Sequence, residues 1–219
     1  MNREPEYKNV RPEPDEAVCF ASPGGVDLIA DVYRAHPATA NGAAVIFVHG
    51  GGWSGGKRED FRWHAAQLAR DGYATCTVDY RLRDQALWPA AVEDCQEAVR
   101  WFRRQAGRLG FDPARLGAMG SSSGGHLVAC LGVFNAPGAD GTPSRVQCVV
   151  DVHGIHDFPA VRDHERIGPS CRKFIGAEFE ENPEAWRAAS PALHADGESA
   201  PMLLTHAPDD PTVPYAVSV

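Results

Sequence analysis

Short runs of apolar and β-branched residues recur along the chain, and each has the length of a β-strand. The middle runs are apolar throughout, which is typical of strands that are covered on both faces. Pro23-Gly24-Gly25 separates the first two runs and is too short for a helix, so it predicts an antiparallel hairpin at one edge of the sheet. The predicted strands are Ala17–Ser22, Leu28–Arg34, Ala43–Val48, Tyr73–Asp79, Leu116–Gly120, Val146–His153 and Pro201–His206.

Between these runs lie segments whose apolar residues recur at helical spacing. Asp60–Asp71 places Phe61, Ala65, Leu68 and Ala69 on one face, and Ala90–Ala106 shows the same pattern more clearly. Ser123–Phe134 consists largely of small and apolar residues and predicts a buried helix. This alternation of strands and helices predicts an α/β fold with a mostly parallel, doubly wound sheet, formed by a single domain over residues 1–219.

The stretch from about 158 to 199 interrupts the alternation. It is polar, contains Pro159, Pro169, Pro183 and Pro191, and has a short helical pattern near Pro183–Ala189. Long excursions in compact domains are often lids or binding loops, so a lid-like segment is one hypothesis. A solvated surface decoration is the alternative.

Composition narrows the class of protein. The chain has 219 residues, of which 43% are hydrophobic and 23% charged, and a formal net charge of −8, which argues against binding nucleic acid or an anionic membrane. Its six cysteines form no C-x-x-C pair, and those in apolar runs, such as Cys148, are expected to be buried free thiols. The N-terminus lacks the apolar core of a signal peptide and no segment is long enough to span a membrane, so we expect a cytoplasmic protein.

Gly120-Ser121-Ser122-Ser123-Gly124 matches the pattern G-x-S-x-G between a predicted strand and a predicted helix. This is the context of a nucleophile elbow, in which the central serine lies on a sharp turn between small residues. The following helix directs its N-terminus at that serine, where negative charge develops during acyl transfer. Ser122 is therefore the candidate nucleophile. A glycine-rich turn without chemistry is the alternative.

His49-Gly50-Gly51-Gly52-Trp53 follows a predicted strand. Successive glycines leave backbone N–H groups free to face an oxyanion, so Gly51 and Gly52 are candidate donors and the N–H of Ser123 completes the set. We expect His49 to be structural. A phosphate-binding loop is the competing hypothesis, but neither a lysine nor a G-x-G-x-x-G pattern supports it.

Asp209 and Asp210 follow the last predicted strand, where a hydrolase with the chain order Ser…Asp…His has its acid. Either carboxylate could orient a histidine and stabilise its charged form. A solvated turn is the alternative.

These motifs resemble those of α/β-hydrolases of the hormone-sensitive-lipase and carboxylesterase kind. They look most similar to the small esterases of the BD-FAE-like and kynurenine-formamidase-like branches. The matching segments are His49–Trp53, Val78–Leu82, Trp88–Asp94, Phe111–Pro113, Gly120–Gly125 and Ser190-Pro191.

The resemblance implies an α/β-hydrolase fold that needs no metal or organic cofactor. It implies Ser122 as nucleophile, Gly51, Gly52 and Ser123 as oxyanion-hole donors, and Trp53 as a substrate-binding residue. Alignment on Val213-Pro214 selects Asp210 as the acid, although Ala207 and Pro208 replace the usual glycine and its neighbour.

In such enzymes the catalytic histidine follows the acid, beyond one more helix and strand. None of the nine histidines follows Asp210, and we expect those near the predicted strand ends, His126, His153, His156 and His206, to serve packing or loop hydrogen bonds. The expectation is a fragment of a longer protein that lacks the last helix and strand, with little or no activity because Ser122 has no base.

The predicted function is hydrolysis of a small carboxylic ester through an acyl-enzyme, with a small-molecule ester as the expected partner and an oligomeric state that the sequence does not determine. Two alternatives remain: an arylformamidase with the same machinery, and a non-catalytic hydrolase-fold binding module.

Overall fold

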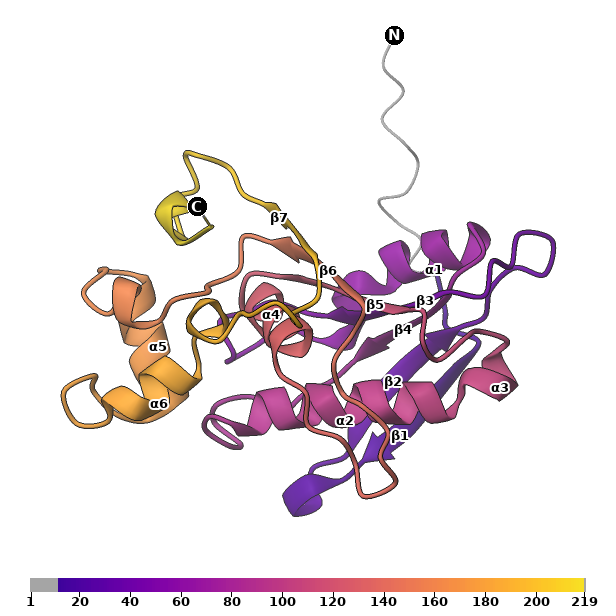
Figure 1. The fold of residues 1–219 in the computed structure, drawn as a ribbon, viewed down its shortest axis with the longest axis horizontal. Helices are drawn as coiled ribbons and strands as arrows, with labels where there is room; N and C mark the ends of the chain where they lie inside the picture. The colour runs from indigo at the N-terminus through magenta and orange to yellow at the C-terminus, as the bar shows by residue number, and fades with distance from the viewer. Residues whose placement is uncertain (1–11, 219) are drawn as a thin grey trace, which may run out of the picture.

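The computed structural model describes residues 12–218, and their strands form one mixed sheet (Figure 1). The order across this seven-stranded sheet is β1-β2-β4-β3-β5-β6-β7. The pairs β1/β2 and β2/β4 are antiparallel, and all other neighbours are parallel. The strands are β1 (Glu16–Ala21), β2 (Leu28–Tyr33), β3 (Ala44–Val48), β4 (Ala74–Val78), β5 (Leu116–Ser121), β6 (Cys148–Val152) and β7 (Met202–Thr205).

Every predicted strand is present, with ends that differ by at most two residues from the prediction. The antiparallel hairpin at the sheet edge is confirmed, and its turn passes through Gly24 and Gly25 at φ +60° and +81°. All five residues of β4 are buried, including Thr75 and Thr77, as expected for a central strand that is covered on both faces.

The helices cover both faces of the sheet (Figure 1), with α1 on one face and α2 and α4 on the other. Strand β3 shows how the layers are built, because its successive side chains point to opposite faces. Ile46 belongs to the larger core beneath α2 and α4, whereas Phe47 packs with Phe61 and Ala65 on the α1 side. The helices are α1 (Arg62–Arg70), α2 (Ala90–Arg104), α3 (Ala106–Leu109), α4 (Ser123–Val133), α5 (Ile167–Ile175) and α6 (Pro183–Ala188).

The excursion 158–199 contains α6, as its sequence predicts, and also α5, which was not predicted. Its aromatic residues Phe158, Phe174 and Trp186 are fully buried, and Phe174 stacks on Trp53 at a centroid distance of 4.5 Å. The segment therefore packs on the core and is not a solvated decoration. Its role as a lid stays a prediction.

All six cysteines are free, and four of them are buried. The prediction of a buried thiol is wrong for Cys148, because this residue begins β6 where the strand emerges from a loop, and its side chain is exposed. Within residues 12–218, no helix combines the length and the apolar character needed to cross a membrane.

Parallel pairing brings the carboxyl ends of five strands, β3 to β7, to one edge of the sheet. In the register, Val48 lies opposite Gly120, Ser121 opposite Val152, and Val152 opposite Thr205. The loops that follow β3, β5, β6 and β7 therefore meet at this edge, which is where open α/β sheets bind their ligands.

Candidate active site

Ser122 occupies the sharp turn between β5 and α4, with φ 53° and ψ −121°. Positive φ is a strained conformation for a residue with a side chain, and such strain concentrates at functional sites. The elbow is held by two backbone hydrogen bonds: Ser122 N–H donates to Val152 O at 2.8 Å, and His126 N–H donates to Ser122 O at 3.0 Å.

The glycines of the elbow are required by close backbone contacts. A Cβ on Gly120 would collide with the carbonyl of Gly124, and one on Gly124 would collide with the carbonyl of Val48. A Cβ on Gly125 would collide with the Asp151 carboxylate. The G-x-S-x-G-G sequence is therefore the condition for α4 to approach the strands closely enough to present Ser122.

The glycine loop after β3 lies directly against the elbow. A Cβ on Gly50 would lie 2.8 Å from Ser121 O and 3.4 Å from Ser122 Cβ. Gly51 and Gly52 have φ +120° and +59°, which turns the backbone sharply beside the serine. Ser123 is the first residue of α4, so its N–H belongs to the helix turn that has no intrahelical acceptor. Gly51 lines one cavity with Ser122, and Ser123 follows Ser122 directly, whereas Gly52 is not among the residues that line this cavity. The role of these three residues as oxyanion donors stays a prediction.

His49 and Trp53, at the two ends of this loop, are both buried. The His49 ring stacks on Tyr80 at 4.3 Å, and Tyr80 Oη donates to His49 O at 3.0 Å. Burial lowers the pKa of His49. These contacts give His49 the structural role expected for it.

Trp53 is 1% exposed, and its Nε1–H donates to Nδ1 of His126 at 3.2 Å. Nε2 of His126 lies 2.8 Å from Ala189 O, which only accepts, so the proton of this ring is on Nε2. Burial lowers the pKa of His126 to about 3, which keeps the ring neutral. The structure therefore places Trp53 in a buried link between the glycine loop and the excursion. Its role in substrate binding stays a prediction.

A cavity of about 490 Å³ opens beside Ser122. The elbow and the glycine loop form one side of it, and the start of α1 with the preceding 3₁₀ turn (Arg58–Phe61) forms the other. Several lining residues are not predicted from the sequence, namely Gly56, Asp60, Phe61, His64, Met119 and Val152. Met119 carries the clearest sequence signal of these, because it lies one residue before Gly120 of the G-x-S-x-G pattern, on a strand that ends at the site.

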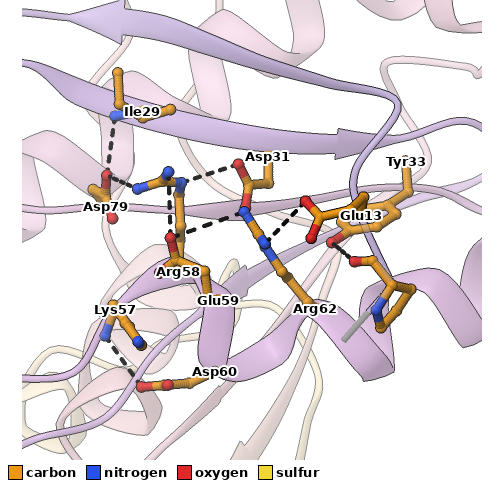
Figure 2. Close-up of polar contacts among 11 residues, drawn as sticks. Glu13, Ile29, Asp31, Tyr33, Lys57, Arg58, Glu59, Asp60, Arg62 and Asp79 are labelled. Atoms are coloured by element: carbon orange, nitrogen blue, oxygen red, sulfur yellow. Dashed lines mark hydrogen bonds and ion pairs between the residues drawn. The ribbon is translucent and has the colours of Figure 1, made fainter. Parts of the chain in front are cut away.

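An ion-pair network fixes this second wall to the sheet (Figure 2). Asp31 on β2 is fully buried and accepts from Arg58 Nε at 3.0 Å and Arg62 Nε at 2.8 Å. Arg58 Nη1 also donates to Asp79 Oδ2 at 3.0 Å. The network connects the wall of the cavity to β2 and to the end of β4. Its members are far apart in sequence, so no local pattern indicates it.

Asp210 lies in the loop after β7, and one of its oxygens is fixed by the backbone. Oδ1 accepts from the N–H groups of Thr212 at 2.7 Å and Val213 at 2.9 Å, and these hydrogen bonds lower the pKa of the carboxyl. Oδ2 lies 3.7 Å from His206 Nε2. Asp210 is thus the anchored member of the Asp209–Asp210 pair, although no contact joins it to Ser122 among the described residues. Its catalytic role stays a prediction.

Three further histidines lie near this edge. His206 is bound within its own loop, with Nδ1 2.7 Å from Ser218 Oγ and Nε2 2.9 Å from Val213 O. His156 contacts the buried Asp151 carboxylate through Nε2, and His153 has φ 47°. Across residues 12–218, no histidine is hydrogen-bonded to the Ser122 hydroxyl.

A strained serine elbow after β5, a glycine loop after β3 and an acid loop after β7, all on a mostly parallel sheet, define an α/β-hydrolase of the serine-esterase type. The family model described as BD-FAE matches residues 30–219, and the chain belongs to this family. The predicted resemblance and fold class are confirmed.

The chain is similar to Esterase LipQ of Mycobacterium tuberculosis (strain ATCC 25618 / H37Rv), with 29% identity over 90% of this chain and 49% of the relative. It is 36% identical to an ethyl acetate hydrolase of Pseudomonas putida, over 76% of this chain and 52% of the relative. Among solved structures, esterase 2 of Thermogutta terrifontis phosphonylated by sarin matches with a TM-score of 0.80 and 28% identity, over 96% of this chain and 78% of that one. The chain spans about half the length of these two curated relatives.

Proposed function

We propose that the protein hydrolyses small carboxylic esters through an acyl-enzyme formed on Ser122. The observation that carries this proposal is the strained Ser122 at the end of β5, lining a cavity together with Gly50 and Gly51. The serine oxygen attacks the ester carbonyl, the alcohol leaves with a proton, and water then cleaves the acyl-enzyme to release the acid. The N–H groups of Gly51, Gly52 and Ser123 stabilise the negative oxygen of the tetrahedral intermediates.

The acid of the mechanism is Asp210, whose Oδ2, the oxygen that accepts no backbone hydrogen bond from the described residues, orients the imidazole that serves as base. Because no described histidine is bonded to Ser122, we expect this 219-residue chain to turn over slowly. Loss of the histidine from a serine triad lowers kcat on the order of a millionfold.

The size of the cavity and the names of similar esterases support a substrate with a short acyl group. Structures of the Thermogutta terrifontis esterase carry butyrate or propionate, and one curated relative is named for ethyl acetate hydrolysis. Phe61 and Met119 give the cavity apolar surface for a short alkyl chain. We therefore propose an ester with an acyl group of about this size as the substrate.

A cytoplasmic location is proposed on separate grounds. All six cysteines are free thiols, a state that a reducing compartment maintains. Fractionation of source cells with an antibody to the protein tests this.

Labelling with a fluorophosphonate probe tests the nucleophile, because the probe reports a single phosphonylation of the serine and needs no second turnover. Without a base bonded to Ser122 we expect the wild-type chain to label slowly, and Ser122→Ala should abolish that labelling. The matched control Ser121→Ala changes the neighbouring serine and should retain labelling.

Rates on phenyl acetate, phenyl butyrate and N-formylkynurenine identify the substrate class. We expect the phenyl esters to be hydrolysed faster than N-formylkynurenine. Faster hydrolysis of the formamide would identify the protein as an arylformamidase and not an esterase. A folded chain that binds these esters without labelling or turnover would be a binding module, and the proposal would be wrong.

A further inference from the structure

A second cavity lies at the end of the sheet opposite to Ser122. It has a volume of about 490 Å³ and is lined by residues from α2, from the loop before β5 and from the segment before β6. Strand β5 begins beside this cavity at Leu116 and ends at the elbow at Ser121, a separation of roughly 16 Å along the strand. The two cavities are therefore distinct. The lining residues are Arg103, Arg104, Pro113, Ala114, Thr142, Pro143 and Gln147.

Arg103 gives this cavity a buried positive charge that has no counter-ion. The residue is only 7% exposed, and it forms no ion pair with a carboxylate of residues 12–218. Its Nη2 donates to Arg145 O at 2.7 Å and to Gln147 Oε1 at 3.0 Å, whereas its buried Nε has no partner. Burial lowers the pKa of this guanidinium. A buried charge is normally paired, so this one is unusual.

The neighbouring arginines of α2 are paired. Arg100 and Arg104 both contact Glu97, and Arg104 Nη1 also lies 3.7 Å from Asp140. The carboxylate of Asp140 is thus paired with Arg104. The absence of a carboxylate at Arg103 is therefore not a general property of this helix.

Gln147 adds a donor whose orientation the structure fixes. Its Oε1 accepts from Arg103 Nη2 and, at 3.2 Å, from Leu116 N–H. Because both of these partners are donors, the amide oxygen must face them and the amide NH₂ group must face away. The residue is exposed and lines the cavity, so this NH₂ group is available to a ligand. Arg103 and Gln147 therefore both offer hydrogen-bond donors to a ligand in this cavity.

We propose that this cavity binds a small oxyanion, a short-chain carboxylate or inorganic phosphate. Arg103 supplies the charge, and Arg104 and the amide of Gln147 supply additional N–H donors. A guanidinium matches the paired oxygens of a carboxylate or phosphate, and such charge-assisted hydrogen bonds are the stronger ones. Pro113 and Ala114 form an apolar wall that a short alkyl chain would contact and a phosphate would not.

The test measures the melting temperature and the heat of binding of the 219-residue chain with sodium butyrate, sodium phosphate or sodium chloride at equal ionic strength. A ligand that binds only the folded state raises the melting temperature in a saturable way. We expect saturation with butyrate or phosphate and only a small, unsaturated effect with chloride. The oxyanion that binds more tightly shows whether the ligand is a carboxylate or a phosphate.

Gln147→Glu is the decisive variant, because it keeps an oxygen for Arg103 and Leu116 and places a carboxylate beside the guanidinium. It should raise the melting temperature without ligand and weaken oxyanion binding at least about tenfold. Gln105→Glu is the matched control: Gln105 also accepts from an arginine, Arg108, but does not line the cavity.

Two results would overturn the proposal. One is stabilisation by butyrate and phosphate that does not exceed that by chloride. The other is oxyanion binding in Gln147→Glu as strong as in Gln105→Glu. Butyrate is also an acid that the proposed reaction would release at Ser122, so only the binding that Gln147→Glu weakens and Gln105→Glu retains is assigned to the cavity at Arg103. The fluorophosphonate reaction of Ser122 is a separate measurement at the other end of the sheet.

Discussion

The backbone at Ser122 is strained, and its neighbours show how the chain maintains that strain. Gly124 has no space for a side chain because its Cα lies against the carbonyls of Val48 and His49. The geometry of the nucleophile thus depends on a contact between α4 and β3, and not only on the turn itself.

Gly124→Ala should therefore damage both stability and the reactivity of Ser122. Forcing a methyl group into this contact costs about 1–3 kcal/mol of unfolding free energy, and shifting α4 away from β3 should slow fluorophosphonate labelling. Gly107→Ala is the control, since Gly107 lies on α3 with open space around its Cα. Urea unfolding and labelling rates are the measurements, and equal behaviour of the two variants would contradict the prediction.

Two buried histidines give stability opposite dependences on pH. The pKa of His126 is lowered to about 3 by burial, so below pH 6.5 the unfolded chain binds a proton that the folded chain does not. The pKa of His156 is raised above 6.5: burial opposes this shift, but the contact with Asp151 outweighs it. His156 therefore contributes stability that is present below pH 6.5 and is lost as pH rises through its folded pKa.

These signs predict that the two histidines together favour folding most strongly near pH 6.5. Stability should fall by up to about 1.4 kcal/mol per pH unit on each side from these groups. His126→Gln should flatten the acid side between pH 5 and 6.5, and His156→Gln should flatten the alkaline side. Urea unfolding of the three chains across pH 5 to 9 measures both slopes. Parallel curves for all three would show that neither histidine is linked to folding.

At the scale of elements, the wall of the active-site cavity depends on buried charge. Asp31 connects β2 to Arg58 and Arg62, and the chain between these arginines carries the cavity residues Asp60 and Phe61. Asp31→Asn removes the charge at constant shape and leaves two arginines facing a neutral group.

We expect Asp31→Asn to lower the unfolding free energy by about 3 kcal/mol and to slow fluorophosphonate labelling roughly tenfold through displacement of the wall. Arg108→Met breaks an exposed pair with Glu16 and should change stability by less than about 1 kcal/mol with no change in labelling. An unchanged labelling rate in Asp31→Asn would show that the ion-pair network does not affect the reactivity of Ser122.

The elements that could be predicted are those with local signals. The strands follow from apolar runs, and α1, α2, α4 and α6 follow from spacing. Helix α5 was missed because Gly168 and Pro169 suggest a loop, yet both lie in its first turn, where proline is tolerated. Its buried residues Ile167, Cys171 and Phe174 do recur at helical spacing.

The candidate site likewise contains residues with a local sequence signal and residues without one. Ser122 and the glycine loop carry their own sequence motifs, and the structure brings them together as predicted. Asp31 and Arg58 are 27 positions apart, and a charged residue within a strand pattern indicates a solvent-facing position. Such pairings depend on which strands become neighbours, and spacing along the chain does not contain that information.

For the molecule as a whole, β7 is one of the two edge strands of the sheet within residues 12–218, and β1 is the other. Strand β7 pairs on one side with β6, and it exposes Leu203 by 59% and Leu204 by 40%. An edge strand with unpaired backbone groups and apolar side chains favours pairing with another copy of the chain. The 219-residue chain is therefore expected to self-associate through β7 as its concentration rises.

Leu203→Lys should reduce this association, because a charge on an edge strand opposes strand addition. The matched control is Leu193→Lys, which changes a leucine that is 50% exposed on the short 3₁₀ helix Pro191–Leu193 and belongs to no strand. Sedimentation velocity over a concentration series should show a lower associated fraction for Leu203→Lys than for wild type and for Leu193→Lys. Equal reductions by both lysines would assign the association to general surface hydrophobicity, and the edge of β7 would have no special part in it.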